Sequence, residues 1–382
     1  MNTPLAAIAV ERLTWFPLVR RPRPPALPLH TRISALRDLA QAADGDLVRA
    51  AETLNKAALI ASDCGLPDLA RSLCWRQYDI FDRARPLPAS AANLAVQPIL
   101  NIVRQLIRDG DTDRAHTLLQ SLHRAARDQT DVVIDGRTVR LHGLVRAALD
   151  EHQTVGALVW AALLADGTRA LTTGGRWREA AEFTRAHRGV GLRLLDGRQA
   201  AILALLHDGD HDHATAMVEQ STIIEPWEHL VQSLLRVLCS RPAPPNRPRP
   251  HVPAMLAEAG AVPDKPDPWS AVFYTRIGLL ALDLAGDDLE HPEAHLNAVI
   301  TTASADAHAA RDALAHPTVR SHPDGQQLSK LTQIVHASGL GIGTIPEPLR
   351  RNLMQAASTA AAHLYATLND TTCAPKGTIR NG

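Results

Sequence analysis

The densest group of side chains able to do chemistry is the stretch His207-Asp208-Gly209-Asp210-His211-Asp212-His213. Imidazole and carboxylate groups are ligands that zinc and nickel take in proteins, so His207, His211 and His213 are candidates for a metal site. No ordered metal motif such as HExxH accompanies them. A solvent-exposed turn, with an aspartate near a helix N-terminus, explains the same residues without a metal. We adopt that interpretation and expect neither a metal nor another cofactor.

A glycine-rich stretch superficially resembles a phosphate-binding loop. It is Gly339-Leu340-Gly341-Ile342-Gly343-Thr344. A dinucleotide fingerprint requires a strand before the glycines and a helix after them. Here a predicted helix ends near Ser338 and Pro346 follows, so we interpret the stretch as a connection between helices. The chain also has no GxSxG, no Walker loop and no cysteine–histidine signature of a thiol enzyme. The sequence therefore identifies no catalytic residue.

An Asp-Gly-(x)-Arg pattern occurs twice, as Asp166-Gly167-Thr168-Arg169 and as Asp196-Gly197-Arg198. Both copies lie near the start of a predicted helix. The pattern would set carboxylates and guanidinium groups on one inner face. Similarity between repeats, with no ligand, explains it equally well, and we prefer that explanation.

Composition narrows the class of protein. The 382 residues include 40 basic and 40 acidic side chains, so no overall field favours nucleic acid or an anionic membrane. Four cysteines are widely scattered, at positions 64, 74, 239 and 373, which predicts reduced thiols in a cytoplasmic protein. No window approaches the roughly 20 apolar residues of a membrane helix. Aromatic residues make up only 3% of the chain, which favours close helix–helix packing over a β-sandwich.

The helices that must position these groups are marked by four glycines, each followed five residues later by an alanine. The pairs are Gly65/Ala70, Gly110/Ala115, Gly175/Ala180 and Gly209/Ala214. Glycine ends one helix because it accepts a left-handed backbone, and a small alanine lets the next helix lie close to the first. The last two glycines are 34 residues apart, and a recurring helical hairpin is typical of an α-solenoid. The predicted fold class is all-α.

One segment breaks the helical pattern. In residues 131–141 two β-branched runs flank Asp135-Gly136, and Asp-Gly between such runs is a strong signal for a tight β-hairpin. We therefore expect an inserted hairpin at about 132–141, lying against the helices or covering a groove, since a lone hairpin is only marginally stable.

Proline content divides the remaining chain. Residues 1–30, which include the basic polyproline II segment Arg20 to Pro25, are expected to form an N-terminal tail or capping arm. The helical-repeat domain would span 31–240, and the proline-rich stretch 241–268 would be a linker that lacks regular structure over 241–253. A C-terminal helical region at 269–369, with helices at 269–285, 293–315, 328–337 and 348–368, and a disordered tail at 370–382 complete the division.

The units Gly175-Arg-Trp-Arg-Glu-Ala-Ala and Gly209-Asp-His-Asp-His-Ala resemble the glycine–alanine step of tetratricopeptide repeats. The stretch from LLADGTRAL to EPWEHLVQSLLRVLC is also similar to uncharacterised actinobacterial helical-repeat proteins. The resemblance covers about residues 50–240. It implies a helical-hairpin solenoid whose concave face binds a peptide or protein, and it does not imply catalysis.

In a tetratricopeptide unit, the positions six, nine and ten residues before the turn glycine point into the groove. Counting back from the four glycines selects Asn55, Asn101, Arg104, Arg169 and Gln199. Asparagine and arginine at such positions hold an extended peptide by its backbone or by a carboxylate. The alternative is that these side chains are solvated on an unoccupied face.

The sequence therefore predicts a non-catalytic scaffold or regulatory subunit with a peptide or protein partner and with no nucleic acid or membrane partner. Two alternatives stay open. The first is a biosynthetic accessory enzyme with a site between the solenoid and the C-terminal helices. The second is a ligand-sensing regulator, although no helix-turn-helix is found at either end.

Overall fold

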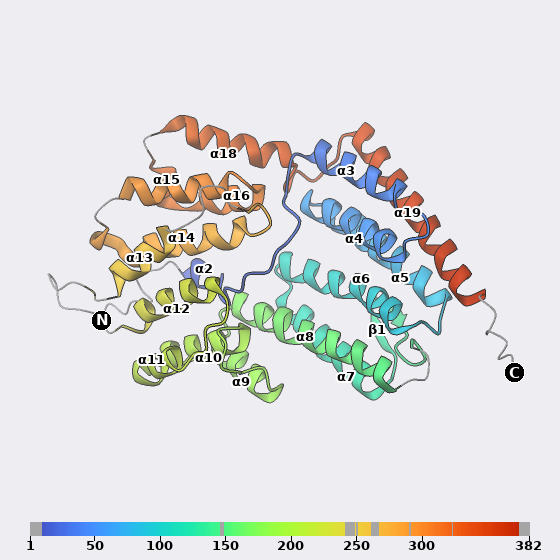
Figure 1. Cartoon of the computed structure of the whole chain (residues 1–382), viewed down its shortest axis with the longest axis horizontal. Coiled ribbons are helices and arrows are strands. Elements are labelled where there is room, and N and C mark those ends of the chain that lie inside the picture. The colour runs from blue at the N-terminus through green and yellow to red at the C-terminus, as the bar shows by residue number, and fades with distance from the viewer. Residues whose placement is uncertain are drawn as a thin grey trace, which may run out of the picture. The chain divides into compact units, whose positions relative to one another are not determined.

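The computed structural model describes residues 10–145, 149–240, 249, 251–260, 267–289, 292–322 and 324–373. It is mostly helical, as predicted, with one small two-stranded sheet among the described residues. The chain forms two compact units (Figure 1). Unit 1 comprises Met1–Pro28 and Leu164–Leu340, and unit 2 comprises Leu29–Leu163 and Gly341–Gly382. No described helix is both long and apolar enough to cross a bilayer.

Unit 2 is a stack of antiparallel helices closed by a helix from the far end of the chain. Its elements are α3 (Leu29–Gln41), α4 (Leu47–Asp63), α5 (Pro67–Arg83), α6 (Ala89–Arg108), α7 (Thr112–Asp128), β1 (Val132–Ile134), β2 (Arg137–Val139), the first part of α8 (Leu149–Thr173) and α19 (Glu347–Cys373). Consecutive helices from α3 to α7 pack together, and α19 packs along α3, α4 and α5. The start of the stack is therefore covered by the chain's own C-terminal helix.

Unit 1 holds the remaining helices. They are α2 (Val10–Leu13), the end of α8, α9 (Trp177–Ala186), α10 (Asp196–His207), α11 (His211–Glu219), α12 (Pro226–Cys239), α13 (Val252–Gly260), α14 (Ala271–Ala285), the 3₁₀ turn η1 (Gly286–Asp288), α15 (Pro292–Ala303), α16 (Ala307–Ala315), α17 (Pro317–Arg320) and α18 (Gly325–Ser338). Neighbours in sequence pack together from α9 to α17, and α18 packs on α15 and α16. One apolar core runs from Leu194 and Ile202 of the α9–α10 region to Leu280 of α14.

The four predicted glycine turns are confirmed. Each glycine has a left-handed φ and lies between two helices, at Gly65 (77°), Gly110 (83°), Gly175 (71°) and Gly209 (79°). An L side chain would be strained in that conformation, which is why the helices end there. The four paired alanines are all fully buried, as close contact between helices requires.

The predicted β-hairpin is also confirmed, with strands slightly shorter than expected. Val132 pairs with Val139 and Ile134 with Arg137, and Asp135 and Gly136 take positive φ values of 52° and 73°. Ile134 and Val139 are buried, whereas Val133 is 65% exposed. The hairpin thus lies against the helices with one face, as its alternating pattern predicts.

The structure divides the chain differently from the sequence. The helices before and after the proline-rich stretch, α12 and α13, belong to the same unit and pack together, with Ser233 Oγ donating to Glu258 at 2.5 Å. Residues 252–260, expected within the linker, form α13. Residues 241–248 lie outside the described part. The C-terminal helices separate, because α14–α18 join unit 1 and α19 joins unit 2. Residues 370–373, expected to be disordered, continue α19, and residues 374–382 are not described.

The helix expected over 293–315 is interrupted. Asp306 stands between α15 and α16, and its carboxylate accepts from the backbone N–H groups of His308 and Ala309 at 2.8 and 3.0 Å. This is an N-cap, and it starts a new helix in place of continuing the old one.

Residues 12–28 do not form a separate arm. Phe16 and Leu18 are 1% and 3% exposed and lie in the core of unit 1. Ala26 N donates to Asp306 Oδ2 at 2.6 Å, and Arg12 Nη2 donates to Asp283 Oδ1 at 3.1 Å. The segment is therefore part of the fold of unit 1.

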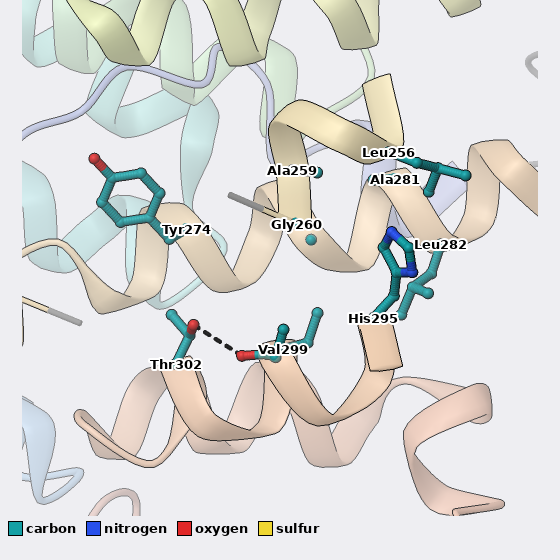
Figure 2. A pocket seen from close by; sticks show the side chains of 11 residues that line it. Leu256, Ala259, Gly260, Tyr274, Ala281, Leu282, His295, Val299 and Thr302 are labelled. Carbon is teal, nitrogen blue, oxygen red and sulfur yellow. Dashed lines mark hydrogen bonds between the residues drawn. The ribbon is translucent and has the colours of Figure 1, made fainter. Parts of the chain in front are cut away.

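Unit 1 contains a small cavity between α13, α14 and α15 (Figure 2). Leu256, Tyr274, Val299 and Thr302 are among its lining residues, and its volume is about 10 Å³. That is room for roughly one water molecule. The Thr302 hydroxyl donates to Ala298 O of its own helix at 2.9 Å (Figure 2). This cavity is too small to bind a ligand.

Helix α12 begins with a pair of glutamates that cap it. Glu228 Oε2 accepts from the N–H groups of Ile224 and Glu225 at 2.6 and 3.0 Å, and Arg193 Nε donates to Glu228 Oε1 at 2.8 Å. Burial by itself would raise the pKa of Glu228, but these donors outweigh it and lower the pKa.

We expect Glu228→Gln to destabilise unit 1 by about 2 kcal/mol at neutral pH, because the amide cannot serve all three donors. A carboxyl whose pKa is lowered by folding stabilises the folded state above its unfolded pKa of about 4.3, and this contribution is lost as the pH falls through the folded value. Urea unfolding of both proteins between pH 3 and pH 7 checks the result. The difference between the two proteins in the free energy of unfolding should be full at pH 7 and shrink below about pH 4. A difference that does not change with pH would contradict this role of the Glu228 carboxylate.

Candidate binding site

Three of the five predicted groove residues are joined in one hydrogen-bonded row in unit 2. Asn55 of α4 donates from Nδ2 to Gln97 Oε1 at 3.1 Å, and Asn101 Nδ2 donates to Asn55 Oδ1 at 3.0 Å. Arg104 Nη1 donates to Asn101 Oδ1 at 3.2 Å. Asn55 and Asn101 are half-buried and Arg104 is exposed. We call these three residues, with Gln97, the polar row.

The polar row follows from spacing along α6. Positions 97, 101 and 104 of α6 are separated by four and three residues, so they share one face of the helix. The same face continues one turn later to Arg108, whose Nη1 lies 3.4 Å from Asp63 Oδ1 at the end of α4. Arg32 of α3 reaches the other oxygen of Asp63 at 2.7 Å.

The glycine-rich stretch does not have the geometry of a phosphate loop. Gly341 N and Gly343 N donate to the carbonyl oxygens of Asp63 and Cys64, both at 2.8 Å. These amides satisfy the C-terminal end of α4 and do not converge on a ligand. Gly65 permits this approach, because a Cβ there would lie 3.4 Å from Gly343 N. The stretch is a connection between α18 and α19, as interpreted from the sequence.

Gln199, the fourth predicted groove residue, holds the backbone of a distant segment. Its Oε1 accepts from Leu18 N at 2.7 Å, and its Nε2 donates to Leu18 O at 2.8 Å. The same Nε2 donates to Leu194 O at 2.7 Å. The predicted chemistry of this position is present in the structure, and the strand of chain that it holds is the N-terminal segment of the same molecule.

Arg169, the fifth, lies in unit 1 near the carboxylates of both Asp-Gly-(x)-Arg patterns. Asp166 and Asp196 both act on its charge, as do Arg276 and Arg21. Arg198 of the second pattern points elsewhere and donates to Ser221 Oγ and Met217 O at 2.8 and 2.7 Å. Arg169 thus interacts electrostatically with carboxylates of both copies of the pattern, for which the sequence left open either charged groups on one inner face or, as preferred, repeat similarity alone.

The histidine candidates for a metal are not gathered around a common point. His211 Nδ1 lies 3.1 Å from Cys239 O, and His213 Nδ1 lies 2.7 Å from Asp210 Oδ2. Within the described residues, no three His, Cys, Asp or Glu side chains are placed to hold a metal ion.

The described thiols are not activated for nucleophilic chemistry. Cys64, Cys74 and Cys239 are buried and unbridged. Burial raises the pKa of Cys64 to about 11 and the pKa values of Cys74 and Cys239 to about 12. At neutral pH these thiols therefore stay protonated and are poor nucleophiles.

An open groove between α5, β2 and α19 was not foreseen. It has a volume of about 770 Å³, and Trp75, Asp79, Arg137 and Tyr365 are among its lining residues. The Arg137 guanidinium lies 4.3 Å from the centre of the Trp75 ring and 2.5 Å from Asp79 Oδ1. The sequence predicted both the hairpin and a helix at 348–368, but it did not predict that residues of both would line one groove with α5.

The five predicted groove residues thus fall into two sets. Asn55, Asn101 and Arg104 lie in unit 2, and Arg169 and Gln199 lie in unit 1. No protein-family model matches this chain, and comparison with curated proteins and with solved structures finds no match.

Proposed function

We propose that this chain is a non-catalytic helical-repeat scaffold or regulatory subunit, of the tetratricopeptide type, which binds a peptide or protein partner. The four glycine-turned helical hairpins support the repeat type. The partner would bind as an extended segment along the polar row of unit 2. Three buried, unbridged thiols favour a reducing compartment, such as the cytoplasm.

One observation carries the proposal. Gln199 stands ten residues before its turn glycine, Gly209. Its side-chain amide accepts a hydrogen bond from Leu18 N and donates one to Leu18 O. Asn55 stands ten residues before Gly65, at the equivalent position of the α4–α5 hairpin. A primary amide at this position is therefore able to bind a backbone N–H and C=O together. Asn55 begins a row of amide groups that ends at the exposed Arg104. Amides supply backbone recognition, and the arginine adds a charged donor for a carboxylate.

Replacing Arg104 by alanine tests the proposal. The purified wild-type chain and Arg104→Ala would be used to capture partners, and the recovered protein would be titrated against each variant. We expect Arg104→Ala to weaken binding by about 2 kcal/mol, or roughly 30-fold, because charge-assisted hydrogen bonds at an interface contribute that much.

Arg127→Ala is the matched control, since Arg127 is an exposed arginine of the same unit that pairs only locally, with Asp128. It should bind the partner as tightly as wild type. A partner that binds wild type, Arg104→Ala and an Asn55→Ala/Asn101→Ala double variant equally well would show that the polar row is not the binding site.

A further inference from the structure

The open groove of unit 2 extends along one face of α5. The residues that this helix contributes recur at spacings of three and four, so they share a face. They are Ser72, Trp75, Arg76, Asp79, Ile80 and Arg83. At a rise of about 1.5 Å per residue they cover about 16 Å of the helix, or roughly three turns. The groove is therefore long enough to take a helical segment of the same length.

The opposite wall of the groove belongs to α19, which packs against α5 (Figure 1). Its lining residues are Ser358, Ala361, Ala362 and Tyr365. Three of these side chains are small, and the distance to which two helices approach each other depends on the side chains at their contact. Tyr365 is 51% exposed and offers apolar surface beside the small residues. This wall leaves room for a further helix.

The groove carries an excess of positive charge. Arg137 of β2 pairs with Asp79 at 2.5 Å, so these two charges cancel. Arg76 Nη1 donates to Ser358 Oγ at 3.2 Å, which holds its guanidinium toward α19. Within the described residues, neither Arg76 nor Arg83 has a carboxylate partner. Two positive charges that line the groove are therefore not neutralised.

The spacing of the two arginines matches that of a helix laid beside α5. Arg76 and Arg83 are seven residues apart, so they stand about 10.5 Å apart along the axis and on nearly the same side. A neighbouring helix has the same rise, so carboxylates seven residues apart on it would meet both arginines. Apolar side chains three and four residues after the first carboxylate would then lie between them. Residues 1–9 and 374–382 contain no acidic side chain, so those parts of the chain lack the complementary charge.

We propose that the groove between α5 and α19 binds an acidic amphipathic helix of a partner protein. Two carboxylates of that helix, seven residues apart, pair with Arg76 and Arg83, and its apolar side chains pack on Ile80 and Tyr365. Charge-assisted hydrogen bonds from the arginines orient the helix, and burial of its apolar face contributes affinity. The groove shares no residue with the polar row, so its test is independent of the peptide binding proposed there.

Calorimetric titration of the full chain with a synthetic helix tests the proposal. The probe is an end-capped, alanine-rich peptide of about four turns, with two glutamates seven residues apart and two leucines between them. We expect it to bind wild type saturably with a Kd below about 1 mM. Arg76→Ala/Arg83→Ala should weaken binding about 10-fold or more, because both charge-assisted contacts are lost. The same peptide with glutamine in place of both glutamates should bind wild type about as weakly.

Two further variants separate the groove from a general effect of charge. Arg124→Ala/Arg127→Ala is the matched control, because it removes two exposed arginines of α7, which does not line the groove. It should bind the peptide like wild type. Ala362→Trp fills the groove without changing its charge, and it should also weaken binding about 10-fold or more. Ala362 is exposed, so this substitution should leave the fold intact.

Four outcomes would overturn the proposal. The first two are that the peptide does not bind wild type, and that Arg76→Ala/Arg83→Ala binds it as tightly as wild type does. The third is binding that appears only after residues 374–382 are removed, which would assign the groove to that segment of the same chain. The fourth is a wild-type dimer, seen in sedimentation, that Ala362→Trp dissociates, which would assign the groove to a second copy.

Discussion

Replacing Phe16 by alanine is expected to cost about 3–5 kcal/mol of the free energy of unfolding, the usual range for a buried aromatic side chain. Phe16 is 1% exposed and lies in the same core cluster as Leu194, Ile202 and Leu280, far along the chain. Its carbonyl oxygen also accepts from Thr172 Oγ1 at 2.8 Å, which fixes the segment against α8. Total stabilities are about 5–15 kcal/mol, so this one change should remove a large share.

Urea unfolding followed by circular dichroism measures the effect. Leu27→Ala is the matched control, because Leu27 belongs to the same segment but is 39% exposed, and it should shift the free energy by less than about 1 kcal/mol. Equal, small effects of the two substitutions would mean that residues 12–28 contribute little to the core of unit 1, as expected for part of the N-terminal tail or arm that the sequence predicts at 1–30.

Replacing Asp63 by alanine is expected to cost roughly 3–5 kcal/mol in unit 2, because it leaves a buried cation without its partner. The side chains of Asp63 and Arg32 are 3% and 9% exposed, and they meet at 2.7 Å. Arg32 Nε and Nη2 already have no hydrogen-bond partner within the described residues, so the guanidinium depends on this one carboxylate.

Two variants make this test specific. The double variant Arg32→Met/Asp63→Leu should be far more stable than Asp63→Ala alone, since apolar residues often replace a buried ion pair with little loss. Asp79→Ala removes an exposed carboxylate that pairs with Arg137, and it should cost no more than about 1 kcal/mol. If Asp63→Ala has the same midpoint of urea unfolding as wild type, the ion pair contributes little to the stability of the folded protein.

The sequence predicts well those elements whose conformation depends on residues next to one another in the chain. The turns at Gly65 and Gly209 and the hairpin at Asp135-Gly136 need a left-handed backbone at one or two positions, and residue type alone reports that need. The boundary between α15 and α16 was missed even so, because Asp306 lies in an alanine-rich run with unbroken helical periodicity, although an N-cap is also a local signal.

The sequence by itself determined the helical hairpins and the β-hairpin, and it singled out Asn55, Asn101, Arg104, Arg169 and Gln199 as candidates for a groove. Only the tertiary structure decided what those residues contact. Gln199 meets Leu18 across 181 positions, and Arg276 meets Asp312 between helices of one unit. The segment around Phe16 and Leu18 has no periodicity to reveal that it would enter a core. Burial and pairing of this kind depend on long-range contacts, which hydrophobic periodicity and turn signals do not encode.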